Sequence, residues 1–116
     1  MFRFENLDIW KSAILFSKRI YVIVEKFPKI EMFALSDQLR RAVVSISANI
    51  AEGSGSDSVK DFKNYLNIAT KSTFEVVSLL AVAQRNEYIS NRDFEELYGI
   101  AEVLVRRIQA FRNSLK

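Results

Sequence analysis

The segment that decides the fold is Gln38–Gly55, which reads QLRRAVVSISANIAEGSG. Its apolar residues recur at spacings of four, three and four: Leu39, Val43, Ile46 and Ile50. This is the period of an α-helix that turns one face to a core. Beside these residues runs a polar stripe made of Gln38, Arg41, Ser45, Asn49 and Glu52. A plain surface helix would carry Lys and Glu there, so the small polar groups indicate a helix that contacts protein on more than one side.

We interpret the polar stripe as a source of hydrogen bonds between helices or between subunits. We expect Arg41 to form a buried or half-buried ion pair with a carboxylate, an arrangement that can fix the register of packed helices. The alternative is that the stripe forms a ligand-binding face.

The composition predicts one all-α domain over residues 1–116. Hydrophobic residues make up 49% of the chain and charged residues 27%, which is typical of a globular protein. There are three Gly and one Pro, too few for the turns of a many-stranded protein. Long helices with few connections are therefore predicted, and they pack as a bundle.

Capping residues and one proline set the predicted helix boundaries at 6–26, 36–53, 58–87 and 91–114. The residues that we expect to cap the four helix starts are Asn6, Ser36, Ser58 and either Ser90 or Asn91. Pro28 ends the first helix. The connection 27–35 is too apolar for a free loop, so we expect it to pack against the bundle with a helical turn.

The third helix is apolar on more faces than one small bundle is expected to cover. Its window Val76–Ala83, VVSLLAVA, contains no charge. A solvent-exposed remainder would be a large apolar patch, which monomeric proteins rarely expose. Self-association through this helix is therefore predicted.

The absence of both Cys and His excludes several kinds of chemistry. It removes the usual zinc sites, Cys/His nucleophile pairs and Ser-His-Asp triads. The loop Gly53–Ser58 lacks the phosphate-binding glycine motifs, and the carboxylates Glu31, Glu52, Asp61 and Glu75 lack the His partners of di-iron bundles. We assign no catalytic, cofactor or metal residues, and an enzyme is the least favoured class.

No uninterrupted apolar run approaches the roughly 20 residues of a membrane span. The N-terminal residues MFRFENLDIWK interleave charges with apolar side chains, unlike a signal peptide. We therefore expect a cytoplasmic protein without a membrane partner.

The charge is mildly basic, with a net +3 and a pI near 9.3. The segment Val103–Lys116 carries four positive charges and no acid. One interpretation is a helix end that complements the helix dipole. The other is a nucleic-acid contact, for which the candidates are Arg40, Lys60, Lys63, Arg106, Arg107 and Arg112.

Several motifs resemble the family of proteins encoded by intervening sequences of 23S ribosomal RNA genes. They are LDIWK at Leu7–Lys11, QLRRA at Gln38–Ala42, SI.ANIAEG at Ser45–Gly53 and F..YL.IA at Phe62–Ala69. The spaced SI.ANIAEG block is the most specific of them. Lys71 departs from the pattern, because the family usually has Gly there.

The resemblance implies an up-down antiparallel four-helix bundle that assembles into a closed ring of five subunits. It also implies a relationship to the accessory protein of diversity-generating retroelements, which works with a reverse transcriptase and nucleic acid. We therefore expect a non-enzymatic homo-oligomer that binds RNA or DNA weakly, or binds a nucleic-acid-processing protein. The alternative is a purely structural or protein-partner scaffold ring that binds no nucleic acid.

Overall fold

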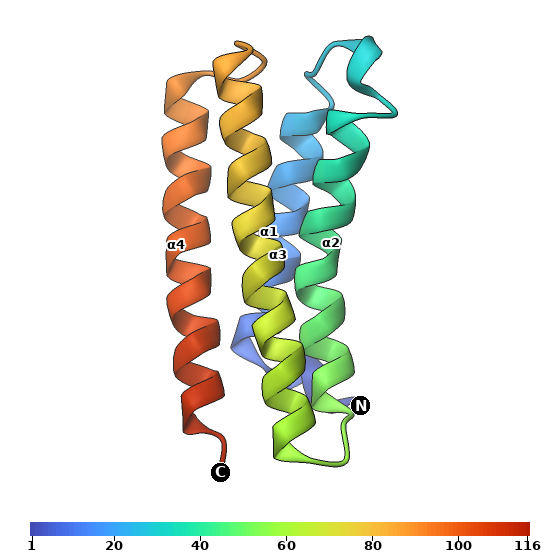
Figure 1. Ribbon diagram of the computed structural model, residues 1–116, viewed down its shortest axis with the longest axis vertical. Coiled ribbons are helices and arrows are strands. Elements are labelled where there is room, and N and C mark those ends of the chain that lie inside the picture. The colour runs from blue at the N-terminus through green and yellow to red at the C-terminus, as the bar shows by residue number, and fades with distance from the viewer.

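Four long helices account for most of the chain in the computed structural model, which describes residues 1–116 (Figure 1). Their bounds are α1 Asp8–Val24, α2 Leu35–Ser54, α3 Val59–Arg85 and α4 Asn91–Ser114. Two short 3-10 helices, η1 Arg3–Asn6 and η2 Lys29–Glu31, precede α1 and α2. Consecutive helices run in opposite directions, and both chain ends lie at the same end of the bundle (Figure 1). The predicted all-α bundle is confirmed.

In the second half of the chain, serine side chains cap the starts of both helices. Ser58 accepts a hydrogen bond from the backbone N–H of Asp61 at 3.1 Å, and Ser90 accepts one from Asp93 at 3.0 Å. Both of these predicted caps are confirmed. The predicted caps Asn6 and Ser36 are wrong: α1 begins after Leu7, and α2 begins after Ala34. At the start of α2 the backbone N–H of Leu35 donates instead to Glu31 Oε1 at 3.4 Å.

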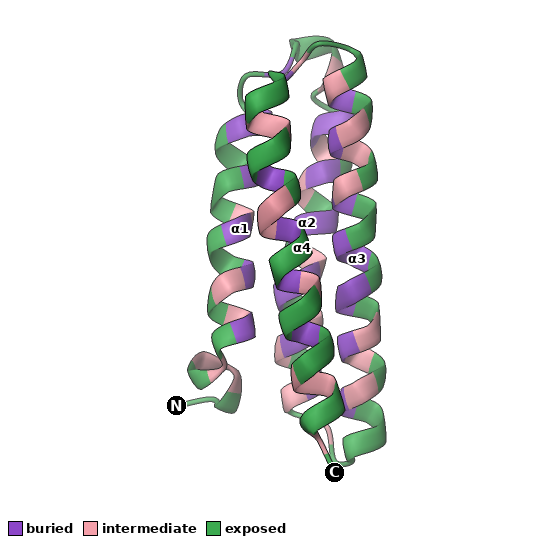
Figure 2. Ribbon diagram, turned by 90° about the vertical axis from the view of Figure 1, so that its left-hand side faces the viewer, coloured by how far each residue is buried: buried purple, intermediate pink, exposed green.

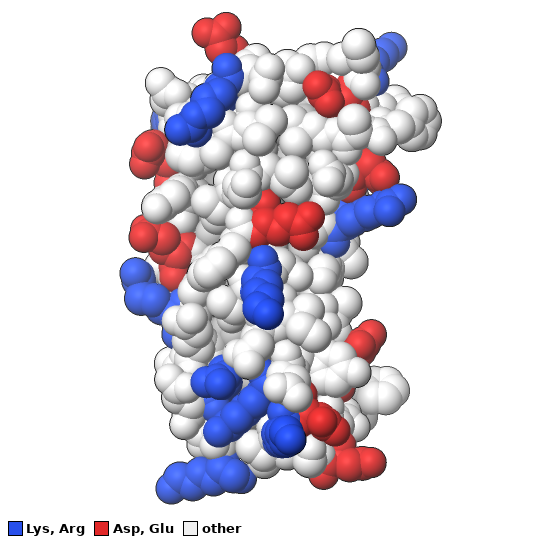
Figure 3. Space-filling view, viewed as in Figure 1, with Lys and Arg blue, Asp and Glu red and all other residues white.

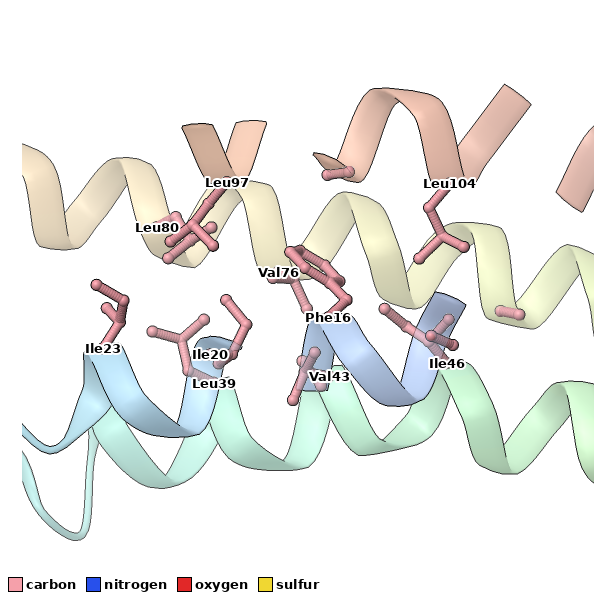
Figure 4. Close-up of a cluster of buried hydrophobic side chains, with 14 of the residues drawn as sticks. Phe16, Ile20, Ile23, Leu39, Val43, Ile46, Val76, Leu80, Leu97 and Leu104 are labelled. Atoms are coloured by element: carbon pink, nitrogen blue, oxygen red, sulfur yellow. The ribbon is translucent and has the colours of Figure 1, made fainter. Parts of the chain in front are cut away.

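The core consists of 24 buried apolar residues contributed by all four helices and the connections between them. The predicted stripe Leu39, Val43, Ile46 and Ile50 is fully buried. Figure 4 shows the first three of these side chains beside Phe16 and Ile20 of α1, and Leu80 of α3 beside Leu97 of α4. Buried positions line the inward face of each helix, while the outward faces are exposed (Figure 2). The helical period of the apolar residues thus builds one continuous core.

The connection between α1 and α2 differs from the prediction. Phe27 and Leu35 are buried as expected, and η2 provides the expected helical turn. Ile30 and Phe33, however, are 86% and 90% exposed. The turn at η2 points their side chains away from the bundle, because Phe27 and Leu35 already cover that end of the core.

The bundle itself covers most of the apolar window in α3. Val76, Leu80 and Ala83 are fully buried, and of the other apolar residues in the window only Val82 is exposed. By length and composition α3 would also pass for a membrane span, a weak indication that core helices of soluble proteins share. The expectation that this window supplies the exposed apolar surface is therefore wrong for most of its residues.

Two of the helix pairs differ in how closely they pack. The C-terminal end of α2 lies close to α3 at Gly53, where an added Cβ would stand 2.8 Å from both Phe62 Cδ1 and Tyr65 Cβ. Only Gly permits this approach. In contrast, α1 and α4 make much less contact with each other than α2 makes with α3. The looser pair leaves an open groove on that side of the bundle.

Candidate functional site

The six predicted basic residues do not lie in one place. Lys60 and Lys63 begin α3, and Arg112 lies near the end of α4. These two segments meet, because the rings of Phe62 and Phe111 contact edge to face with centroids 5.6 Å apart. The other three predicted residues lie elsewhere: Arg40, Arg106 and Arg107.

We call the place where these two segments meet the basic end. Arg3 joins it, since its guanidinium lies 5.1 Å from the centroid of the Phe62 ring. Its remaining members come from α3, α4 and the C-terminus: Lys60, Lys63, Arg112 and Lys116. Figure 3 shows Lys and Arg side chains gathered over the start of α3 and the end of α4, with acidic side chains to one side.

At the basic end, the guanidinium of Arg112 has hydrogen-bond partners for only part of its nitrogen atoms. Arg112 donates from one terminal nitrogen to Asn113 Oδ1 at 3.0 Å, while its Nε is buried without a hydrogen-bond partner. The nearest acid in α3 is Asp61, which is exposed in the first turn. The sequence pattern missed Arg3, because only the folded position of η1 brings it to Phe62.

The remaining predicted basic residues contact their own chain. Arg40 reaches the carbonyl oxygen of Met32 at 3.4 Å, at the opposite end of the bundle from Lys60. Arg107 donates to Ser12 Oγ at 3.1 Å and so links α4 to α1. Arg106 is exposed beside α3. These residues do not join the basic end.

Part of the polar stripe forms hydrogen bonds between helices, as we interpreted it. The hydroxyl groups of Ser45 on α2 and Ser72 on α3 lie 2.8 Å apart. The amide nitrogen of Asn49 donates to the Ser45 carbonyl at 2.8 Å and to its hydroxyl at 3.0 Å. Lys71, where the family usually has Gly, is exposed beside Ser72, so it does not disturb this packing.

The other stripe residues lie on the surface of this chain. Arg41 pairs with Asp37 at 3.1 Å, within α2, and its side chain is 80% exposed. The predicted buried or half-buried pair is therefore wrong for the single chain. Asp37 lies four residues before Arg41, so the two side chains are neighbours on the surface of the same helix. An exposed pair of this kind contributes little to stability. Gln38 and Glu52 are also exposed.

The groove between α1 and α4 is the largest hollow on the molecule, with a volume of about 790 Å³. Its apolar lining comes from both helices: Leu15, Phe16, Val22, Ile100, Val103 and Leu104. Three cations border it, Lys18, Arg19 and Arg107, and no acid does. Arg19 crosses to Glu96, so one of the three charges is paired.

A second, smaller hollow of about 370 Å³ lies on the neighbouring side of α4, between α3 and α4. Phe74 of α3 and Tyr98 of α4 border it and are both exposed. Glu102 and Arg106 lie on its outer side. Helix α4 therefore separates a basic apolar groove from an apolar face that carries both signs of charge.

One titratable group is clearly perturbed, at the end of the bundle opposite the basic end. The hydroxyl of Tyr88 donates to Glu31 Oε2 at 2.9 Å. This hydrogen bond raises the pKa of Tyr88, and desolvation and the Glu31 charge act in the same direction. The contact ties η2 to the loop between α3 and α4, which is a structural role.

No three acidic side chains lie close enough together to hold a metal ion. The structure brings together cations and apolar surface, which can bind anions or protein.

Comparison with known proteins adds two findings. The model of the family described as 23S rRNA-intervening sequence protein matches residues 5–110. A crystal structure from Bacteroides thetaiotaomicron, of a protein with unknown function from the S23 ribosomal protein family, superposes with a TM-score of 0.84 at 27% identity. The match covers 91% of this chain and 99% of that one. A search of the curated proteins gives no match.

Proposed function

Because the chain belongs to the family of 23S rRNA-intervening sequence proteins, we propose that it is a non-enzymatic, ring-forming module that binds RNA or DNA weakly. The observation that carries the proposal is the basic end, where the start of α3 and the end of α4 meet through Phe62 and Phe111 and Lys and Arg side chains gather on one face. Phosphate contacts of this kind supply affinity without reading sequence. The binding is therefore expected to tolerate any sequence.

Assembly into a ring gives the protein enough positive charge to bind nucleic acid. One chain carries a net +3, so it neutralises few phosphates by itself. A ring of five would carry a formal 5 × 3 = +15 and present five basic ends. In a closed ring with the bundles parallel to the axis, cyclic symmetry turns all five ends to the same side. Linked weak contacts then add up to useful binding.

The alternative is a ring that serves only as a scaffold or binds a protein partner. The arrangement of charge supports nucleic acid, since Lys and Arg side chains gather at the basic end with the acidic side chains to one side of them. Elsewhere on the face in Figure 3, positive and negative side chains are intermixed. The proposal therefore concerns one end of the bundle rather than its sides.

The experiment compares two triple variants by fluorescence anisotropy with mixed-sequence oligonucleotides. Lys60→Gln/Lys63→Gln/Arg112→Gln removes cations from the basic end. The logarithmic salt slope should fall by roughly 0.7 to 0.9 for every phosphate that the variant no longer binds.

The matched control removes three exposed cations at the opposite end of the bundle: Lys26→Gln/Lys29→Gln/Arg92→Gln. This control lowers the net charge by the same amount as the first variant. A difference between the two variants therefore reports where the cations lie and not how many were removed. Equal decreases in affinity for both variants, or no binding by the wild type at about 50 mM salt, would support the scaffold alternative.

A further inference from the structure

The α1/α4 groove contains a glycine for which the fold gives no reason. Gly99 lies in the middle of α4, where Gly costs roughly 0.5–1 kcal/mol relative to Ala. A Cβ added there would meet nothing within 4 Å, in contrast with Gly53, which α3 approaches closely. Gly99 also lines the groove. The missing side chain therefore leaves room for something from outside the chain.

The apolar lining of the groove is open to water in the single chain. Leu15 is 66% exposed, and Val22 and Val103 are also exposed. Two copies cannot bury these residues by pairing groove to groove. A two-fold contact would bring the cations of one groove, which include Lys18 and Arg107, against those of the other, and like charges at an interface are unfavourable. The occupant must present apolar side chains with acidic neighbours.

The α3/α4 face of the same chain has this character. Phe74 is 59% exposed, and Tyr98 is exposed beside it. One carboxylate, Glu102, and one guanidinium, Arg106, line it from the exposed side of α4. The face is therefore apolar and carries the carboxylate of Glu102 beside Tyr98, together with Arg106, whereas the charged residues that line the groove are all cations.

We propose that the α1/α4 groove receives the α3/α4 face of a second copy of this chain, head to tail. This inference rests on the ring assembly proposed above and names the two surfaces that form it. Phe74 and Tyr98 are the apolar anchors, and Lys18 of the groove meets Glu102 of the inserted face.

The positions of the two surfaces favour closure. They are neighbouring sides of a four-helix bundle that share α4, so they meet at roughly a right angle. Repeating a contact between neighbouring sides turns each copy relative to the last until the chain of copies closes after four or five. Contacts between opposite sides would instead extend as an open filament.

The positions of the contacting side chains along the bundle axis also agree with this contact. The Arg107–Ser12 and Arg19–Glu96 contacts show which levels of α1 and α4 face each other. They place Leu15 near the level of Glu102. In a ring of parallel bundles, copies meet at equal heights, so Lys18 falls at the turn between Tyr98 and Glu102 of its neighbour.

The test uses two lysine variants at exposed positions, Leu15→Lys in the groove and Phe74→Lys on the inserted face. Lys is a good helix former, and both positions are mostly exposed, so folding is preserved. Circular dichroism and a cooperative melt verify this. Each variant alone should be a monomer by light scattering, because an ammonium would be buried in the contact.

Mixing the two variants gives the decisive result. Each retains one intact surface, so the mixture should form dimers that stop at two chains. The two lysines would face each other in the second contact, and no ring can close. The control Ile68→Lys, an exposed apolar position on another side of α3, should assemble like the wild type.

The outcomes separate the two proposals. A monomeric wild type would overturn the ring and this inference together. An assembled wild type whose Leu15→Lys and Phe74→Lys variants also assemble would leave the ring intact but overturn this choice of surfaces. Monomeric variants that fail to form dimers on mixing, or an Ile68→Lys variant that dissociates, would overturn it as well.

Discussion

The hydroxyl groups of Ser45 and Ser72 lie 2.8 Å apart and join α2 to α3 inside the most extensive helix contact of the bundle. Asn49 donates to Ser45 from the next turn of α2, which leaves the Ser45 hydroxyl free to donate to Ser72. The polar stripe of α2 thus continues the core packing by hydrogen bonds. It explains why small polar residues occupy positions where a surface helix would carry charges.

We predict that Ser72→Ala lowers the free energy of unfolding by about 1 kcal/mol, the usual net value of such a hydrogen bond. Combining it with Ser45→Ala should show a coupling of about 0.5 kcal/mol or more in a double-mutant cycle by urea denaturation. Ser78→Ala, an exposed position on the same helix, serves as the control. Additive effects of the two serines would argue against the bond.

Gly53 should not tolerate a side chain. Gly53→Ala places a Cβ 2.8 Å from the Tyr65 Cβ, which lies next to the α3 backbone and cannot move aside easily. We expect the free energy of unfolding to fall by roughly 1–3 kcal/mol, measured by thermal or urea unfolding. Gly55→Ala is the matched control, since its Cβ would be at an ordinary 3.6 Å from the Glu52 carbonyl. Equal stability of the two variants would contradict the close packing of α2 and α3.

The Tyr88–Glu31 contact predicts a dependence of stability on alkaline pH. The folded pKa of Tyr88 is raised above its ordinary value of about 10, so the unfolded chain loses this proton first. The stabilising contribution is complete below about pH 10 and disappears as the pH rises through the folded pKa. Urea midpoints of the wild type and Tyr88→Phe should therefore converge above that pH. A difference that stays constant would show that the shift is absent.

The helices and the core are predictable from sequence because their signals are local. Ser58 and Ser90 cap the backbone three residues ahead, and the apolar stripe of α2 follows the helical period. The family is predictable from spaced motifs, and the match over residues 5–110 confirms it. The predicted cap of α2 is wrong because Ser36 is buried within the helix, one residue past its first residue, Leu35.

The candidate surfaces depend on contacts between distant segments, so the sequence predicts them only in part. Arg3 reaches the ring of Phe62 from the far end of the chain, and no periodicity connects the two. Arg107 follows Arg106 directly in the sequence, but one helical step of about 100° turns it toward α1 and Ser12. The exposure of Ile30 and Phe33 also follows from the path of the connection rather than from its composition.

The central claim is that assembly turns a weakly basic chain into a nucleic-acid-binding ring. The most direct measurement is the salt dependence of oligonucleotide binding by wild type and by Phe74→Lys at equal chain concentration. We predict a steep slope for the wild type and weak binding with a shallow slope for the variant, although the variant gains one positive charge. Equal binding by the two proteins, with the variant shown to be a monomer, would contradict the claim.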